Sequence, residues 1–126
     1  MFWTAWVTLA ALAVYIWMIV NVGRARQRYQ VPAPLTEGPQ EFMSVMRVQM
    51  NTVEQLIIFL PALWLCAWFL GDRYAAAGGV VWILGRVIYA RAYYRNPADR
   101  ELGFGLTAAA SFALMAGAVV GLLTLP

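Results

Sequence analysis

The sequence has no histidine, no lysine and a single cysteine. Without histidine, Ser-His triads, histidine metal sites and histidine general bases are all excluded. The single cysteine, Cys66, excludes an internal disulfide, and it lies in an apolar run where a thiolate is disfavoured. Any chemistry must therefore rest on arginine, glutamate, tyrosine, asparagine and serine.

Charge is also scarce. Only 12% of the 126 residues are charged, while 63% are hydrophobic, and the charged share is about half that of an ordinary soluble domain. A soluble domain this small must cover its surface with polar groups, because its surface is large relative to its core. This sequence has too few charged residues to do so. The net charge of +3 is too small and too scattered to indicate nucleic-acid binding. The composition predicts a membrane protein.

Four segments are long enough to cross a bilayer, which takes about 20 residues for about 30 Å of hydrocarbon. They are residues 1–23, 42–70, 74–95 and 102–126. A cleavable signal peptide is the alternative for the first segment, but no basic residue precedes it and no small-residue cleavage site is evident before Arg24. We therefore expect an all-α integral membrane protein, with residues 1–126 forming one four-helix domain.

Basic residues indicate the orientation of this bundle, because they stay on the cytoplasmic side of a membrane. Six arginines lie in or near the first and third connections: Arg24, Arg26, Arg28, Arg91, Arg95 and Arg100. The opposite side has only Arg73, next to Asp72. We expect a multi-pass protein with both termini on the non-cytoplasmic side and with its site opening toward the cytoplasm.

Several residues predict local features of the helices. Pro61 is expected to kink the second helix, and Pro97 to break the third helix just before Arg100. The Gly117-x-x-x-Gly121 pattern is expected to allow close helix approach. The tryptophans expected in an aromatic belt near the outer surface are Trp3, Trp6 and Trp82.

Polar side chains form a stripe on each of the two middle helices. Arg47, Asn51 and Glu54 are spaced i, i+4, i+7, which keeps them within about 60° of arc. The stripe on the third helix consists of Arg86, Tyr89 and Tyr93. Ionisable groups at membrane depth are costly unless they are paired or hydrated. Salt bridges that fix helix packing are one explanation, and a binding cleft between the stripes is the other.

Such a cleft would suit a small zwitterion. Arginine offers a fixed fork for carboxylates, Glu54 a counter-charge for an amine, and Asn51 and the tyrosines neutral hydrogen bonds. The apolar helix faces beside the cleft would admit a lipophilic second substrate.

A family resemblance rests on these motifs. The run RVQMNTVEQL at 47–56 is followed by FLPALW at 59–64, and RxxYxxxY begins at Arg86. Together with Arg26 and Arg100, this pattern resembles the membrane-associated proteins in eicosanoid and glutathione metabolism, the MAPEG family. The resemblance covers residues 24–104 and, by helix count, the whole chain.

The resemblance implies a homotrimer of four-helix subunits, with a glutathione site at each subunit interface and no metal. Glutathione would be the co-substrate of a membrane-bound transferase that acts on hydrophobic electrophiles in detoxification, with glutathione-dependent peroxidase activity on lipid hydroperoxides as a further activity. The residues expected to bind glutathione are Arg26, Arg47, Gln49, Asn51, Glu54, Arg86, Tyr89 and Tyr93.

Arg100 matches the family's arginine that stabilises the glutathione thiolate, so it is the expected catalytic residue. A thiol with a pKa near ~8.5 is mostly protonated at neutral pH, and a nearby guanidinium favours the anion. Gln27 stands where the leukotriene-forming branch has a second arginine, so a leukotriene-type substrate is not implied.

Two other functions stay open at this point. One is a non-catalytic lipid-binding or partner-presenting protein of the same fold, which the presence of Arg100 and the full stripe argue against. The other is a small four-helix transporter, in which Glu54 would be the proton-coupling residue and substrate would move without glutathione.

Overall fold

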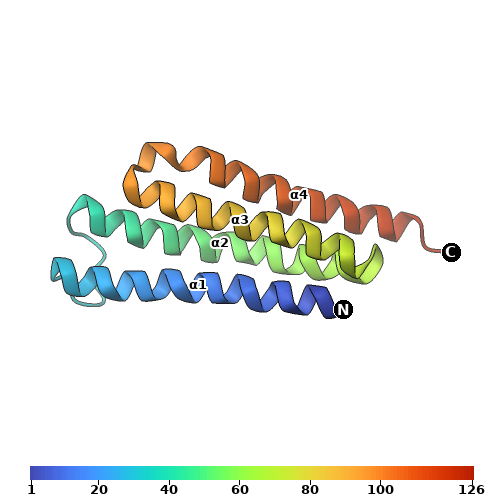
Figure 1. Cartoon of the computed structure of the whole chain (residues 1–126), viewed down its shortest axis with the longest axis horizontal. Helices are drawn as coiled ribbons and strands as arrows, with labels where there is room; N and C mark the ends of the chain where they lie inside the picture. The colour runs from blue at the N-terminus through green and yellow to red at the C-terminus, as the bar shows by residue number, and fades with distance from the viewer.

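The computed structural model describes residues 1–126 as four long helices that run antiparallel to their neighbours along the chain (Figure 1). The helices are α1 (Phe2–Tyr29), α2 (Gln40–Phe69), α3 (Asp72–Arg95) and α4 (Glu101–Leu123), with a 3-10 turn, η1 (Pro97–Arg100), before α4. Both termini lie at one end of the bundle, and the α1–α2 and α3–α4 connections lie at the other (Figure 1).

All four helices are long and apolar enough to cross a membrane. This confirms the expected all-helical, four-helix membrane bundle. The first helix is longer than expected, because it continues past Gly23 to Tyr29. Arg24 and Arg28 therefore lie on the last turns of α1 and not in a loop, which corrects the sequence-based boundary. A charged helix end still forms its backbone hydrogen bonds, so the end of an apolar run does not mark the end of a helix.

The main core has buried residues from all four helices, and Trp82 is one of them. The Trp82 ring is fully buried and stacks on Phe59 of α2, with ring centroids 4.1 Å apart and planes 6° apart. The prediction that Trp82 belongs to an interfacial belt is therefore wrong. Trp3 and Trp6 are exposed near the N-terminus. Hydropathy alone does not separate a lipid-facing tryptophan from one that faces a neighbouring helix.

Glycine allows α4 to pack closely against its neighbours. A Cβ on Gly121 would overlap the backbone of Phe69, and one on Gly117 would come within 2.9 Å of the Cys66 sulfur. This confirms the expected close approach along the Gly117-x-x-x-Gly121 pattern. Gly103, near the other end of α4, would overlap the backbone of Tyr89 in the same way.

The two prolines act differently. Helix α2 continues through Pro61 as one helix. At Pro97 the chain leaves the helix: α3 ends at Arg95, and the chain then turns into η1. This confirms the expected break, because proline has no amide hydrogen and clashes with the preceding helical turn. Arg100 consequently ends a separate turn and does not continue the α3 stripe.

The first residue of α3 also fixes the start of α1. Helix α1 has no side-chain cap of its own at Met1. Instead, Asp72 accepts hydrogen bonds from the backbone N–H groups of Trp3 and Thr4, at 3.0 and 2.8 Å. The Thr4 hydroxyl donates a third bond to the same carboxylate, at 2.7 Å. A carboxylate at a helix N-terminus satisfies free amides and complements the helix dipole, so Asp72 anchors α1 to α3.

Candidate functional site

The polar stripes of α2 and α3 meet at Arg86. Its side chain is fully buried, and one guanidinium nitrogen donates to Asn51 Oδ1 at 2.8 Å and to Thr52 Oγ1 at 3.2 Å. The other terminal nitrogen donates to Thr107 Oγ1 at 2.9 Å. Arg86 thus joins α2, α3 and α4 through neutral oxygen atoms. Within the chain its partners are hydroxyl and amide groups and not carboxylates, which differs from the salt-bridge explanation of the stripes.

Aromatic rings complete the surroundings of this arginine. The guanidinium carbon lies 4.2 Å from the centroid of the Tyr89 ring and 5.8 Å from that of Trp82. Tyr89 in turn packs against Tyr93, with ring centroids 5.6 Å apart. The electron-rich ring faces partly balance the buried positive charge. Asn51, Arg86, Tyr89 and Tyr93 therefore form one continuous group, as the two stripes predicted.

Charged side chains surround this group at the surface. Arg47 and Glu54, from the same stripe as Asn51, are both exposed. Arg47 lies one helical turn before Asn51 on α2, and Arg100 precedes by three residues Gly103, which lies against the backbone of Tyr89. Arg100 is exposed and donates one hydrogen bond, to the Pro97 carbonyl, at 2.8 Å. We call the residues of the two stripes, together with Arg100, the stripe cluster: Arg47, Asn51, Glu54, Arg86, Tyr89, Tyr93 and Arg100.

The other two predicted residues, Arg26 and Gln49, face away from the stripe cluster. Gln49 donates to the Tyr15 hydroxyl of α1 at 2.6 Å. At about 100° per residue, Gln49 and Asn51 project about 160° apart around α2. Arg26 is bound to the α1–α2 connection, where it donates to the carbonyls of Leu35 at 2.7 Å and Val31 at 3.2 Å. The predicted site residues thus fall on two sides of the chain.

Sequence reasoning missed Thr52 and Thr107, which hold Arg86. Thr52 is next to Asn51, and Thr107 is one of two hydroxyl-bearing residues in the largely apolar α4, with Ser111. Both side chains are fully buried. Intramembrane polar residues that face a bundle interior pair with one another, so Thr107 was a detectable signal once Arg86 was noticed. The chain holds no group of three or more acidic, cysteine or histidine side chains arranged to bind a metal ion.

Comparison with known proteins finds one matching family and several relatives. The model of the MAPEG family matches residues 4–120. An uncharacterised protein of Synechocystis is 45% identical over 121 residues, which is 96% of this chain and 88% of that protein. Leukotriene C4 synthase of Bos taurus is 34% identical over 117 residues, covering 93% of this chain and 78% of the relative.

A further relative, microsomal glutathione S-transferase 2 of Bos taurus, is 32% identical over 122 residues, covering 93% of this chain and 84% of the relative. The family match spans nearly all of the four-helix bundle. The chain belongs to the MAPEG family.

Proposed function

We propose that the protein is a membrane-bound glutathione transferase that joins the glutathione sulfur to lipophilic electrophiles. The observation that carries this proposal is the stripe cluster, in which a buried arginine, an amide and two tyrosines lie beside an exposed carboxylate and two exposed arginines. Glutathione presents an ammonium group, two carboxylates and amide groups, which need this mixture of partners. Two relatives are named for glutathione transfer or leukotriene C4 synthesis.

The stripe cluster supports a division of roles in binding. Glu54 pairs with the glutathione ammonium and Arg47 with a carboxylate, since both side chains are exposed on one face of α2. Asn51 hydrogen-bonds the peptide backbone of the ligand, with Tyr89 and Tyr93 beside it. Arg86 positions Asn51 and does not touch the ligand, because the arginine is fully buried and already donates to the Asn51 oxygen.

The division of the predicted residues supports a closed ring of subunits, which we propose is a homotrimer. Arg26 and Gln49 lie on the α1 side of α2, while the stripe cluster lies on the other side. One chain therefore cannot bring all of them to one ligand. In a cyclic assembly the two sides of neighbouring subunits meet at every interface. Each interface then holds one complete glutathione site, and the exposed Arg47 and Glu54 gain partners there.

Arg100 is the proposed catalytic residue. Its guanidinium has one hydrogen bond within the chain, so its other N–H groups are free to face the glutathione sulfur. The positive charge favours loss of the thiol proton to water, and the thiolate then attacks the electrophilic carbon. A carbon–sulfur bond forms as the leaving group departs. Lipid hydroperoxides are the proposed second class of substrate, for a glutathione-dependent peroxidase activity. The thiolate attacks the hydroperoxide and the O–O bond breaks to leave the lipid alcohol, and a second glutathione then converts the oxidised sulfur to the disulfide with release of water.

The arginine-rich end of the bundle is proposed to face the cytoplasm, with both termini on the opposite side. Arginine-rich connections stay on the cytoplasmic side of membranes. The stripe cluster then takes glutathione from the cytoplasm, and the lipophilic acceptor enters sideways from the bilayer.

The test is conjugation by the purified protein in mild detergent, with a panel of electrophiles and hydroperoxides, with and without glutathione. Arg100→Ala is expected to keep most of the glutathione affinity while losing the ultraviolet absorbance of bound thiolate and most of the rate. Its charge acts only after the proton leaves, so removing it affects the anion more than the bound thiol. Arg100→Lys is expected to rescue only part of the rate, since lysine is a point charge on a different stem.

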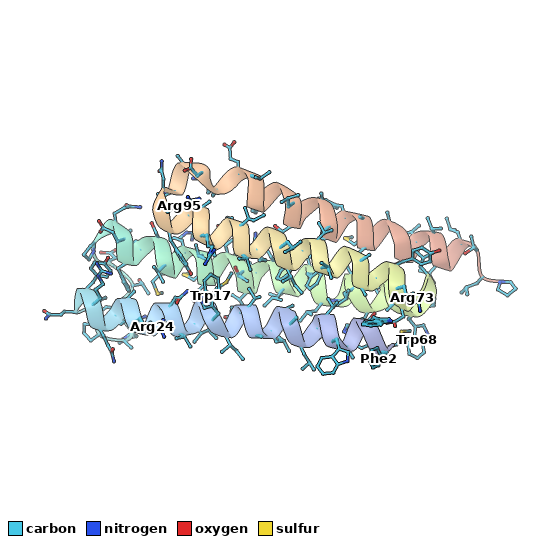
Figure 2. All side chains as sticks on the ribbon, in the orientation of Figure 1. Phe2, Trp17, Arg24, Trp68, Arg73 and Arg95 are labelled. Atoms are coloured by element: carbon cyan, nitrogen blue, oxygen red, sulfur yellow. The ribbon has the colours of Figure 1, made fainter.

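Arg73→Ala is the matched control, because Arg73 is also exposed but lies at the other end of the bundle (Figure 2). It is expected to leave thiolate formation unchanged. Thiolate formation by Arg100→Ala at the parental level and neutral pH would refute the catalytic assignment. Glutathione-independent movement of a substrate across vesicle membranes, with no conjugation, would favour the transporter.

A further inference from the structure

A polar cavity lies between α1 and α3, apart from the stripe cluster. It has a volume of about 740 Å³ and is open to the outside of the bundle. Helix α2 contributes Glu41 and Val45, which project roughly 130° around α2 from the Arg47–Glu54 stripe. None of the residues assigned to glutathione lines this cavity. We call it the arginine cleft, after the residues at its mouth: Arg24, Arg28, Arg91 and Arg95.

The arginine cleft concentrates positive charge. Its four arginines form two i, i+4 pairs, one on α1 and one on α3, so that each pair lies on one helix face. All four side chains are exposed, and the arginines of this chain that donate hydrogen bonds are three others, Arg26, Arg86 and Arg100. The only acidic residue that lines the cleft is Glu41. Because four arginines and only one carboxylate line the cleft, its net charge is positive and favours an anionic ligand.

The floor of the arginine cleft changes from polar to aromatic. The Asn21 side-chain amide donates to the Tyr94 hydroxyl at 3.3 Å, which links α1 to α3. Trp17 packs against the same tyrosine, with ring centroids 6.1 Å apart. Figure 2 shows Trp17 farther along the bundle than Arg24 and Arg95, which lie near its end. The ligand must therefore be polar at the mouth and apolar deeper in.

An apolar groove of about 360 Å³ adjoins this floor, between α1 and α3. It shares Trp17 and Arg91 with the arginine cleft, and its other lining residues are Ala13, Val14 and Val87. At 1.5 Å per residue, Ala13 lies roughly 16 Å along α1 from Arg24. The two adjoining cavities thus extend from a charged helix end into the membrane-spanning part of the bundle.

We propose that the arginine cleft and this groove bind one anionic phospholipid, with its phosphate among the arginines and one acyl chain against Val14 and Val87. Guanidinium groups bind phosphate with paired, charge-assisted hydrogen bonds. Basic pockets between membrane helices are typical sites for anionic headgroups. Glutathione or free phosphate would fill the mouth alone and leave the groove without an apolar occupant. The adjacency of the two cavities, which share Trp17 and Arg91, therefore favours a lipid.

Native mass spectrometry of the purified protein, titrated with lipid, tests this proposal. The probes are dioleoyl phosphatidylglycerol and dioleoyl phosphatidylcholine, which have the same chains and differ in net charge. The parent is expected to prefer phosphatidylglycerol. The double variant Arg91→Gln with Arg95→Gln is expected to bind phosphatidylglycerol about tenfold or more weakly, since it loses half of the charged donors. The control Arg73→Gln is expected to bind like the parent.

A second variant tests the groove without changing charge. Ala13→Phe places a ring in the groove from an exposed position. It is expected to weaken phosphatidylglycerol binding while leaving glutathione conjugation unchanged. Equal phosphatidylglycerol binding by the parent and the double arginine variant would overturn the proposal.

Two competitors identify the source of the anion. Glycerol 3-phosphate carries the phosphate without acyl chains, and glutathione is the soluble anion of the other site. Neither is expected to displace phosphatidylglycerol at an equal concentration. Displacement by glycerol 3-phosphate would make the cleft a site for soluble phosphates, and displacement by glutathione would assign it to the transferase reaction. Either result refutes the lipid assignment.

Discussion

At the scale of single residues, Arg86 is the charged side chain that the fold buries completely. It is fully buried, and removing a charge from water costs several kcal/mol. Its terminal nitrogens are satisfied by Asn51, Thr52 and Thr107, while its Nε has no hydrogen-bond partner. Because the Arg86 Nε–H is already unpaired, losing one of these acceptors would leave a second guanidinium N–H of Arg86 buried without a partner. Thr52 and Thr107 therefore contribute to the stability of the fold by accepting hydrogen bonds from the buried Arg86.

Thr107→Val removes one of these acceptors and keeps the shape of the side chain. We expect the free energy of unfolding to fall by about 1 to 3 kcal/mol, the cost of leaving a buried polar group unpaired. Equilibrium unfolding in mild detergent measures the change. The matched control is Ser111→Ala on the same helix, because the Ser111 hydroxyl is buried without a partner. Its removal is expected to be neutral or stabilising. Equal losses in both variants would contradict the role given to Thr107.

Glu54 is an exposed carboxylate on the membrane-spanning helix α2, and in the proposed function it binds the glutathione ammonium. Glu54→Gln is expected to weaken glutathione binding by about 1.5 to 3 kcal/mol, the range for hydrogen bonds to charged groups. Isothermal titration of the assembled protein measures this loss. Glu37→Gln, an exposed carboxylate in the α1–α2 connection, is the control and is expected to bind glutathione like the parent. Unchanged affinity in Glu54→Gln, with assembly intact, would leave Glu54 a structural role only.

At the scale of elements, the contact between α3 and α4 supports the stripe cluster. Gly103 lies directly against the backbone of Tyr89, where a side chain would overlap. Tyr89 packs on Arg86, and Thr107 is one turn beyond Gly103 on α4. The close approach at Gly103 therefore determines how near the Thr107 acceptor comes to Arg86.

Gly103→Ala is expected to push α4 away from α3, to lower the melting temperature and to reduce glutathione binding with it. The clash is with backbone, which cannot move as a flexible side chain would. The control is Gly105→Ala, because a Cβ there meets no atom within 4 Å. Since alanine has a higher helix propensity, Gly105→Ala is expected to be neutral or to stabilise by up to about 1 kcal/mol. A stable, fully binding Gly103→Ala would disprove the tight contact.

At the scale of the whole molecule, the two sides of the chain carry complementary halves of the proposed site. Arg26 and Gln49 lie on the α1 side, and Glu54 and Asn51 lie on the other. A heterologous interface joins unlike surfaces, and a ring of such interfaces leaves neither surface unpaired. Activity should then depend on residues from two different subunits.

Mixing two impaired variants, assayed at a glutathione concentration too low to saturate either of them, tests this dependence. Glu54→Gln impairs one half of the site, and Arg26→Gln impairs the other. Random co-assembly in a ring is expected to restore about one quarter of the parental sites, because each interface then has an even chance of receiving each intact half. Conjugation by the refolded mixture measures the recovery, and native mass spectrometry should show trimers. Trimers that form from both variants and regain no activity would place the whole site within one chain.

The sequence by itself determined the number of helices, the break at Pro97 and the two polar stripes. These features depend on local chemistry: the length of apolar runs, the missing amide of proline and the 3.6-residue helical period. The close helix approach along the Gly117-x-x-x-Gly121 pattern of α4 could be predicted for the same reason. The high cost of isolated polar groups in a membrane also indicated that the two stripes need partners, although it did not say which side chains would meet.

The tertiary structure alone decided which neighbour each helix face meets. Helical periodicity orients a side chain around its own axis, but it carries no information on the position of the other helices. For this reason Trp82, expected at the membrane surface, is stacked in the core, and Arg86 is held by Thr107 from a distant part of the chain. The division of Arg26 from Glu54, and the arginine cleft between α1 and α3, likewise arise only when the helices pack.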